Sequence, residues 1–201
     1  MSKNVVIVLA HPLNDSLCAH LAALATATIV QAGHSPRLVD LYAHGFDPRL
    51  TGRERKTYYA DEYDSSAIAA DKADLLTADV LVLVFPTWWF GLPAILKGWI
   101  DRLFVPGVAY DHAPDFGRMI PRLTKLRACL VVTTLGSPWW IDRFVMFRPV
   151  RRVLSRAIIG TCAPQASFSM LSLYETERLS AERLTAFERR LVRALRRLLC
   201  P

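Results

Sequence analysis

The sequence has only four cysteines among 201 residues, and they stand far apart, at positions 18, 129, 162 and 200. No two of them form a C-x-x-C pair, and no histidine stands at metal-ligand spacing from them. Disulfide-stapled scaffolds and zinc sites need clustered cysteines, so both classes are excluded. We therefore expect four reduced thiols, no metal centre and a cytoplasmic location.

Long apolar runs are also missing. The two longest uncharged stretches, residues 80–96 and 157–174, are both interrupted by proline and glycine. A helix that spans a bilayer needs about 20 consecutive apolar residues. The N-terminus enters an apolar run at once, without the basic region and cleavage site of a secretory signal. We expect neither a membrane span nor a signal peptide, and a 52% hydrophobic composition excludes a disordered chain.

Lysine is absent from residues 148–201, which hold eleven Arg and four Glu. The formal net charge of the whole chain is +7, so the entire excess lies in this last quarter. Nucleic acid, a membrane surface and a basic helix face all fit such a patch. Seven of these arginines fall at 178–197, around an apolar stripe at helical spacing, which favours a solvated helix face over nucleic-acid binding. The other four are candidates for attracting an anionic nucleotide: Arg148, Arg151, Arg152 and Arg156.

Apolar β-branched runs alternate with segments of helical periodicity along the whole chain. Strands are predicted at residues 5–10, 36–41, 80–85, 128–133 and 165–170, and helices at 17–31, 66–77, 92–104, 143–158 and 180–199. Residues 42–65 are polar and without clear period, so they are predicted as a long loop. This order predicts one α/β domain over residues 1–201, with a doubly wound open parallel sheet of five strands and helices on both faces.

In such a sheet the ligand lies beyond the carboxyl ends of the strands. The loop at 11–18 ends at a predicted helix N-terminus, where free backbone N–H groups attract an anion, and His11 and Ser16 can add donors. The Gly-rich dinucleotide motif and the P-loop motif are both missing. A plain helix cap at Asp15 or Ser16 explains the same residues equally well.

The loops at 86–92 and 133–140 are rich in aromatic residues. Trp88, Trp89 and Phe90 follow a buried strand, where a flat ligand would explain them, although burial against a neighbouring element or a partner subunit is the alternative. The other loop adds Gly136 and Trp140. No activated nucleophile and no carboxylate cluster are visible, so a cofactor is expected to carry the reaction.

These residues resemble the flavodoxin-like NAD(P)H:quinone oxidoreductase family, the DT-diaphorase-like flavoproteins. The specific part of the resemblance is the unbroken stretch from Trp89 to Arg102, which is supported by the Ala-His-Pro at 10–12, the Phe-Pro at 85–86 and the Thr pair at 133–134. The resemblance implies a structural role for residues 97–102. It also implies a bound flavin and a homodimer.

By this resemblance, the flavin would be held by three groups of residues. The phosphate groups would contact His11, Ser16, Leu17 and Cys18. The isoalloxazine would be lined by Pro86, Thr87, Trp88, Trp89 and Phe90, and its pyrimidine end covered by Thr134, Leu135 and Gly136. The nicotinamide and acceptor would stack against Trp89, Phe90, Tyr110 and Trp140.

The implied activity is two-electron reduction of a quinone by NAD(P)H, in a ping-pong sequence through flavin N5. FAD is the expected flavin, with FMN as the alternative. A second hypothesis is an ancillary flavoprotein of a membrane transport system, with incidental reductase activity. The chain departs from the family after the fourth strand, where Leu135, Pro138 and Ile141 interrupt the usual Gly-rich loop and the family's Tyr–His pair is not found. Arg148 is a candidate for opposing the charge of the reduced flavin instead.

A basic cluster in the long loop also has two interpretations. Arg49, Arg53, Arg55 and Lys56 could contact an adenosine phosphate or the 2′-phosphate of NADPH. The alternative, which we favour, is an exposed loop in which acids such as Glu54 are interspersed.

Overall fold

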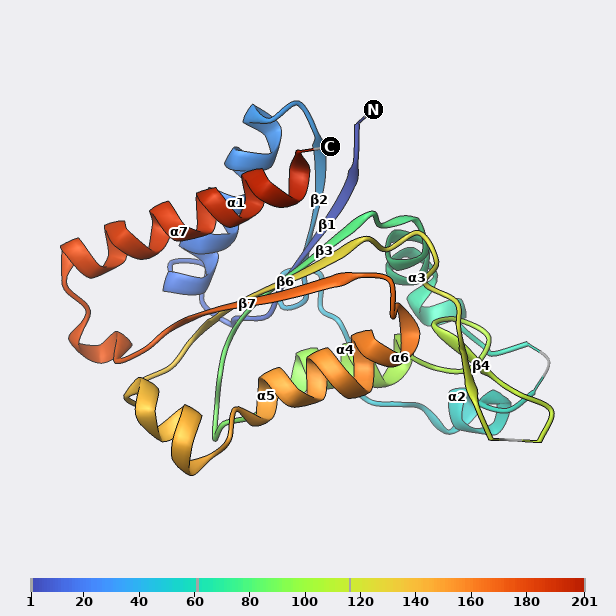
Figure 1. Ribbon diagram of the computed structural model, residues 1–201. Coiled ribbons are helices and arrows are strands. Elements are labelled where there is room, and N and C mark those ends of the chain that lie inside the picture. The colour runs from blue at the N-terminus through green and yellow to red at the C-terminus, as the bar shows by residue number, and fades with distance from the viewer. Residues whose placement is uncertain (1, 61, 116, 201) are drawn as a thin grey trace.

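A central sheet of five parallel strands organises the chain. The computed structural model describes residues 2–60, 62–115 and 117–200. The strands run in the order β2-β1-β3-β6-β7 (Figure 1). All four neighbouring pairs are parallel, which confirms the predicted sheet. Their bounds are β1 Asn4–Leu9, β2 Ser35–Asp40, β3 Val80–Pro86, β6 Ala128–Thr134 and β7 Ser167–Leu173.

The order of the strands reverses between β1 and β3, which places the expected ligand crevice at the carboxyl ends of these two strands. Every residue of β3 and β6 is buried, because helices cover both faces of the sheet. Side chains alternate between the faces along each strand. Val5 and Ile7 of β1 belong to one core, whereas Val6 and Val8 belong to the other.

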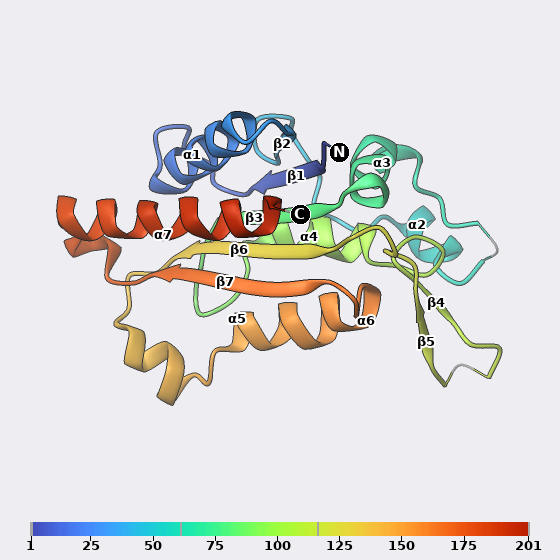
Figure 2. The same cartoon turned by 45° about the horizontal axis from the view of Figure 1, so that its top comes forward.

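Two helical layers cover the sheet (Figure 2). Helices α1 (Leu17–Gln31) and α7 (Ala181–Leu199) pack on one face. The other face is covered by α3 (Ala69–Thr77), α4 (Ala94–Leu103) and a continuous run made of α5 (Pro149–Arg152), η3 (Val153–Ile159) and α6 (Gly160–Cys162). None of the helices in the described part of the chain has both the length and the apolar character needed to cross a bilayer.

Helix α7 bears out the interpretation of the basic C-terminal quarter. Ser180 caps it, accepting a hydrogen bond from the Arg183 N–H at 3.3 Å. Phe187, Leu191 and Leu195 are buried against the sheet, whereas the arginines of α7 are exposed. The excess positive charge of this segment therefore lies on a solvated helix face.

The predicted long loop at 42–65 contains a short helix, α2 (Gly52–Thr57). The Thr51 hydroxyl caps it by accepting the Glu54 N–H, and the Glu54 carboxylate accepts the Thr51 N–H in return, forming a capping box. Glu54 also forms a buried ion pair with Arg102 of α4. Its six residues have too little apolar periodicity for a helix to be predicted. The ion pair with Arg102 stabilises the helix instead.

The predicted helix at 143–158 is wrong at its start. Residues Ile141–Val145 form a separate π-helical turn, η2, and the next helix begins at Pro149. Phe147 and Arg148 between them both have φ of 54°, in the left-handed region. Proline disfavours helical geometry at the residue before it, which explains the break at Arg148.

Two further predictions need correction. The last strand lies at Ser167–Leu173 rather than at 165–170, so its carboxyl end is three residues further along. The antiparallel ribbon of β4 (Tyr110–His112) and β5 (Met119–Pro121) was not predicted, because each strand is only three residues long.

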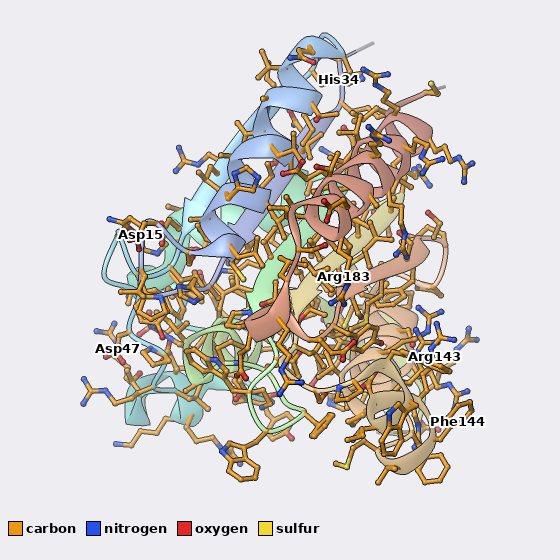
Figure 3. All side chains as sticks on the ribbon, turned by 90° about the vertical axis from the view of Figure 1, so that its left-hand side faces the viewer. Asp15, His34, Asp47, Arg143, Phe144 and Arg183 are labelled. Carbon is orange, nitrogen blue, oxygen red and sulfur yellow. The ribbon has the colours of Figure 1, made fainter. Side chains whose placement is uncertain are left out.

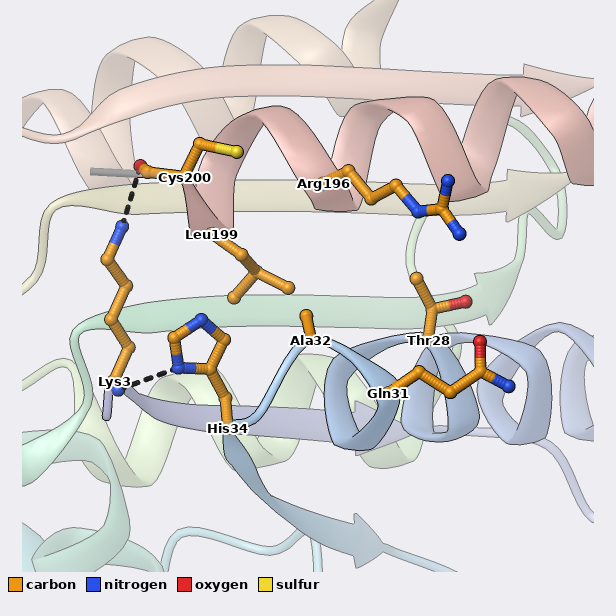
Figure 4. Close-up of a pocket in the computed structure, with 8 residues that line it drawn as sticks. All are labelled: Lys3, Thr28, Gln31, Ala32, His34, Arg196, Leu199 and Cys200. Carbon is orange, nitrogen blue, oxygen red and sulfur yellow. Dashed lines mark hydrogen bonds between the residues drawn. The ribbon is translucent and has the colours of Figure 1, made fainter. Parts of the chain in front are cut away.

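A pocket lies at the amino end of the sheet, far from the carboxyl ends (Figure 4). It is bordered by Lys3, whose ammonium donates hydrogen bonds to the carbonyl oxygens of Leu198 at 2.8 Å and Cys200 at 3.2 Å. The Lys3 backbone N–H donates to His34 Nδ1 at 3.1 Å. These contacts fasten the beginning of the chain to the C-terminal end of α7, which is a structural role.

Candidate functional site

The N-terminus of α1 follows directly on the loop after β1. Ser16 is its cap, and its Oγ accepts the Ala19 N–H at 3.1 Å. Capping is therefore confirmed as one role of Ser16, and the hydroxyl hydrogen stays available to donate. The N–H groups of Leu17 and Cys18 stand in the first turn, where they have no acceptor within the helix. Together these donors form a place for an anion at the positive end of the helix dipole.

His11 connects this loop to the aromatic loop. Its Nδ1 accepts the Leu13 N–H at 3.1 Å, which leaves the ring proton of the neutral side chain on Nε2. The ring centroid lies 6.5 Å from that of Trp88, with the planes tilted by 57°. His11 can therefore donate from Nε2 toward a ligand between the two loops.

The loop after β3 is a tight turn with an unusual backbone. The Gly91 N–H donates to the Trp88 carbonyl at 2.9 Å, and the two residues between them, Trp89 and Phe90, have φ of 50° and 55°. Left-handed geometry is rare for bulky residues and costs about 1–3 kcal/mol at each position. The turn carries the Trp89 side chain into solvent, where it is 99% exposed. Within the described chain no neighbouring element buries it, so a ligand or a partner subunit remains as the reason for this aromatic turn.

The loops after β3 and β6 are joined by hydrogen bonds. The Thr87 N–H donates to the Thr134 carbonyl at 2.8 Å, and the hydroxyls of Thr87 and Thr133 lie 2.7 Å apart. The Thr134 hydroxyl in turn lies 3.5 Å from Cys18 Sγ at the start of α1. The three predicted ligand loops therefore meet at one edge of the sheet, with Pro86 buried at the end of β3 between them.

Cys18 can contact a ligand through its backbone N–H rather than through its thiol. Burial raises the pKa of this thiol to about 11, against a smaller lowering by the hydrogen bond with Thr134. Burial also raises the pKa values of Cys129 and Cys162 to about 12. All three stay protonated at neutral pH and none is an activated nucleophile, as expected from the sequence.

Leu135 is less available for contact with a ligand than the sequence suggests. Its N–H already donates to the Leu173 carbonyl at 2.8 Å, and its side chain is buried. Gly136 follows at an exposed position, where the Glu177 carboxylate would lie 3.1 Å from an added Cβ. The next residue, Ser137, was missed: its Oγ is buried, and no residue in the described part of the chain hydrogen bonds to it. This hydroxyl is a donor without a use inside the protein.

Tyr110 lies away from the other candidate residues. It belongs to β4, and its hydroxyl lies 3.3 Å from that of Tyr58, beyond α2. Figures 1 and 2 both show β4 at the opposite end of the molecule from the turn at 88–91, with α4 running between them. Within one chain the predicted wall of Trp89, Phe90 and Tyr110 is not brought together. Trp140 lies in the segment after β6, at the same edge of the sheet as the other loops, and is 49% exposed.

A polar cluster at this edge was not predicted. Asp142 is buried, and its carboxylate accepts the Tyr174 hydroxyl at 2.8 Å. The Arg148 N–H donates to the Asp142 carbonyl at 2.7 Å. Burial and the nearby Asp142 raise the pKa of Tyr174, and the positive charge of Arg148 opposes this shift. Tyr174 directly follows β7, so a correctly placed end of that strand would have identified it.

The basic cluster of the long loop is engaged within the protein. Arg49 pairs with Asp47 at 2.9 Å, and Arg53 pairs with Asp64. The guanidinium of Arg55 lies 5.5 Å from the centre of the Tyr58 ring. These contacts support the interpretation as an exposed loop. Among the described residues, no group of three His, Cys, Asp or Glu side chains could hold a metal ion.

Comparison with known proteins identifies the family. The family model described as "Flavodoxin-like fold" matches residues 3–181. A ribosyldihydronicotinamide dehydrogenase (quinone) of Pongo abelii is 34% identical over 200 residues, covering 88% of this chain and 86% of the relative. The chain belongs to the flavodoxin-like NAD(P)H:quinone oxidoreductase family. The parallel sheet and its strand order are those expected of a flavodoxin-like member.

Other similarities either cover less of the chain or are at lower identity. An uncharacterized NAD(P)H oxidoreductase, YcaK, of Escherichia coli (strain K12) is 36% identical over 121 residues, and the match covers 59% of this chain and 62% of the relative. The chain thus spans less than two thirds of that protein. The solved structure of an FMN-dependent NADH-azoreductase from Bacillus anthracis, in complex with FMN, superposes with a TM-score of 0.76 at 16% identity, covering 98% of this chain and 99% of the other. At this identity the likeness shows the shared fold.

Proposed function

We propose that this protein is a flavin-dependent NAD(P)H:quinone oxidoreductase whose flavin lies at the carboxyl edge of the sheet, in a single domain of residues 1–201. The observation that carries the proposal is the strained turn at Trp89 and Phe90, which exposes a tryptophan. The ring of the preceding residue, Trp88, lies 6.5 Å from that of His11 in the loop that leads to α1. A flat ring system with a phosphate attached matches both features. The similarity to a quinone dehydrogenase over most of the chain supports it.

The donors at this edge fit a flavin. Leu17 and Cys18 offer N–H groups to a phosphate, and Ser16 offers its hydroxyl hydrogen. Ser137 adds a buried hydroxyl without a partner among the described residues, next to the place where the pyrimidine edge is expected. Polar flavin edges need such donors, and a buried hydroxyl that lacks any partner costs free energy.

When bound, a flavin would supply the hydride chemistry of the reaction, in which a quinone gains two electrons and one proton from NAD(P)H, and a second proton from solvent, to become the hydroquinone. The chain's own contribution would be positioning. Trp89 and Phe90 would form an apolar wall that stacks flat rings in turn and keeps water out. His11 Nε2 and the first turn of α1 would hold the phosphate and fix the position of the rings. Arg148, beside Tyr174 and Asp142, would place one positive charge where the reduced flavin is anionic.

The active protein is proposed to be a homodimer. Tyr110 and the turn at 88–91 lie at opposite ends of one chain, so they can line a common site only between two copies. Tyr110 itself lines a groove of about 310 Å³, which is formed by α4, the helix run of α5 to α6 and the ribbon of β4 and β5. Val153 and Met119 border the groove and are each 44% exposed. A second copy seated on it would cover both side chains.

FAD is proposed as the flavin, with FMN as the alternative. The unbroken match to the DT-diaphorase-like stretch at 89–102 favours FAD, whereas a solved protein of the same fold holds FMN. Mass spectrometry of the flavin released from purified protein distinguishes the two directly.

The proposal is tested by an absorbance spectrum and a steady-state assay. We expect yellow protein, or uptake of added FAD or FMN, and oxidation of NADH or NADPH that is stimulated by menadione. Assays with both nucleotides, and with azo and nitroaromatic acceptors beside quinones, would define the preferred substrates. Colourless protein that takes up neither flavin would overturn the proposal.

A further inference from the structure

Strand β7 is the outer strand on one side of the sheet, and its outer side carries unpaired backbone groups. Successive residues of a strand point their N–H and C=O groups to opposite sides. The Ser167 N–H and the Leu173 carbonyl both bond to residues at the ends of β6, at 2.9 and 2.8 Å, so the odd-numbered residues face inward. The outward N–H and C=O groups belong to Phe168, Met170 and Ser172. Within the described residues, no hydrogen bond satisfies these groups.

The opposite edge of the sheet, at β2, is protected against a further strand. Its outward residues are Pro36, Leu38 and Asp40, because the Leu41 N–H donates inward to β1 at 3.0 Å. Pro36 has no N–H, and the Asp40 carbonyl already accepts the His44 N–H at 3.1 Å. By contrast, β7 has the sequence Ser-Phe-Ser-Met-Leu-Ser-Leu, without charge or proline. An edge strand of this kind is one to which another strand can add.

A row of arginines on α7 lies along this open edge. Glu188 bonds His20 of α1 at 2.6 Å, which fixes the side of α7 that faces α1. The opposite side carries one arginine every seven residues, namely Arg183, Arg190 and Arg197. Arg183, at the start of α7 in Figure 3, donates to the carbonyl of Tyr174, directly after β7, at 2.8 Å. From there α7 runs back along β7 (Figure 2), and residues 183–197 span about 21 Å, close to the length of a seven-residue strand.

The positive charge of this row is not balanced within the described chain. Neither Arg190 nor Arg197 forms an ion pair there, and Arg183 approaches the Glu175 carboxylate only to 3.7 Å. On the other face of β7, Arg151 lies over the Phe168 ring, 5.4 Å from its centre. A strand added to β7 would lie about 4.8 Å further out, between arginines on both faces.

We propose that the outer edge of β7 binds an extended acidic segment of a partner protein, as a sixth strand of the sheet. The backbone of that segment would pair with the outward N–H and C=O groups of β7. Alternate side chains would lie on the α7 face, where glutamate or aspartate meets the arginine row, and the side chains between them would pack beside Phe168 and Met170, which are half-buried. This binding goes beyond the proposed function and does not depend on it.

An acidic strand fits this edge better than other partners. Two copies of β7 would pair antiparallel about a two-fold axis, which would bring the arginine row of each copy against that of the other. Nucleic acid would contact the arginines but would leave the backbone groups of β7 unpaired. The edge is also separate from the groove proposed for the dimer, because no residue of β7 lines that groove in the described chain.

The test is a binding titration with a synthetic acidic strand. The probe is a fluorescein-labelled peptide of seven residues in which valine alternates with glutamate, and its anisotropy is followed at physiological salt as the full-length protein is added. We expect saturable binding, and about tenfold weaker binding of the same peptide with lysine in place of glutamate. Arg190→Gln/Arg197→Gln should bind the probe about fivefold more weakly. The matched control Arg189→Gln/Arg193→Gln removes the same charge from another side of α7 and should bind like the wild type.

The backbone half of the proposal has its own variants. Met170→Pro removes an N–H that faces outward and leaves the hydrogen bonds to β6 in place, so it should abolish binding of the probe. Met170→Ala loses the same side chain but keeps the N–H, and it should still bind. Hydrogen exchange measured by NMR should slow at Phe168, Met170 and Ser172 when the probe is added. Urea unfolding would verify that each variant is folded.

Methylation of the probe tests the same hydrogen bonds without any change to the protein. One peptide is N-methylated at its valines and another at its glutamates, with the charges unchanged. Only one of these two sets of N–H groups can face β7, so one of the two peptides should fail to bind. The failing set also gives the direction of the added strand, which is the valine set for an antiparallel strand and the glutamate set for a parallel one.

Three results would overturn the proposal: no binding of the acidic probe, binding of both methylated peptides, or exchange at the outward residues of β7 that the probe does not change. A smaller assembly for Met170→Pro than for Met170→Ala in sedimentation would assign the edge to a second copy and would also overturn it. So would preferred binding of a single-stranded oligonucleotide through Arg190 and Arg197. Each result is independent of flavin content, so failure here is distinguishable from failure of the proposed function.

Discussion

Arg102 Nη2 lies 2.7 Å from Glu54 Oε1, and both side chains are almost completely buried. Arg102 also donates to the Asp47 carbonyl at 2.6 Å. This pair fastens α2 and the preceding loop to α4, the helix that follows the aromatic turn. The pair thus links the stretch at 89–102, which resembles the family, to the loop at 42–65, whose sequence has no clear period.

Replacing one partner of this pair should destabilise the protein strongly. Arg102→Met leaves Glu54 buried and unpaired, which we expect to lower the free energy of unfolding by about 3–5 kcal/mol. Lys97→Gln is the control, because the Lys97–Asp101 pair is exposed on the same helix and should contribute less than about 1 kcal/mol. Urea unfolding measures both variants. Equal losses would contradict the assignment of the buried pair as the stabilising one.

Glu54 should also make stability depend on pH. Burial opposes its charged form, but the hydrogen bonds from Arg102 and Thr51 hold the pKa of Glu54 below its usual value. The unfolded chain then binds more protons as the pH falls below about 4.3, so this stabilisation is present above that pH and is lost as the pH falls through the lower, folded pKa. Urea unfolding at a series of acidic pH values should show that the free energy of unfolding changes less with pH in Glu54→Gln than in the wild type. Parallel curves for the two proteins would show that Glu54 does not contribute to this pH dependence.

We expect the strained aromatic turn to lower the stability of the protein while its Trp89 side chain supports quinone turnover. Trp89→Gly should raise the free energy of unfolding of the flavin-free protein by roughly 0.5–1 kcal/mol, because relief of the left-handed strain exceeds the entropic cost of glycine. Trp89→Ala keeps the strain and should give no such gain. Both variants should lose quinone turnover, because both lose the stacking surface. The idea fails if the two variants are equally stable or if turnover is unchanged.

Two helix caps allow the phosphate role of Ser16 to be separated from its structural role. Ser16→Ala and Ser180→Ala should each cost about 1 kcal/mol of stability. Only Ser16→Ala should weaken flavin binding, by about tenfold or more, because its hydroxyl is expected to donate to a charged phosphate. Quenching of flavin fluorescence on titration measures the dissociation constants. Wild-type affinity in the Ser16 variant would remove Ser16 from the site.

Arg148 is expected to act on the reduced flavin. Arg148→Ala should slow flavin reduction by NADH about tenfold, which corresponds to about 1.4 kcal/mol of lost charge stabilisation. Arg152→Ala removes the same charge from an exposed position on the next helix and is the control. Stopped-flow loss of the flavin absorbance gives both rates. An unchanged rate in the Arg148 variant would show that its charge does not reach the site.

The sequence predicted the parts of the fold that local patterns encode. The continuous apolar runs of β1 and β3 are typical of strands in a sheet that is covered on both faces. The stripe of leucine and phenylalanine in α7 is typical of a helix that faces a core. The sequence could not predict α2, because its stability comes from an ion pair with a residue 48 positions away. Nor could it predict the left-handed Phe147 and Arg148, which depend on Pro149 and on the hydrogen bond to Asp142.

The candidate site also contains residues that the sequence predicts and residues that it does not. The residues at the carboxyl ends of β1, β3 and β6 were predicted together, because the topology of a parallel sheet brings them to one edge. Tyr110 was grouped with them by resemblance alone, and only the length of α4 reveals how far it lies from Trp89. Ser137 and the Asp142–Tyr174 hydrogen bond depend on which polar atoms are buried, which no local pattern records.

The burial of three of the four thiols has a practical consequence. Cys200 is the exposed cysteine among the described residues, at the end of α7 and far from the aromatic turn. A maleimide dye added to folded protein should therefore attach at this position alone. Such a label reports on rotation and assembly of the protein by fluorescence anisotropy, without touching the edge of the sheet where the flavin is proposed to bind.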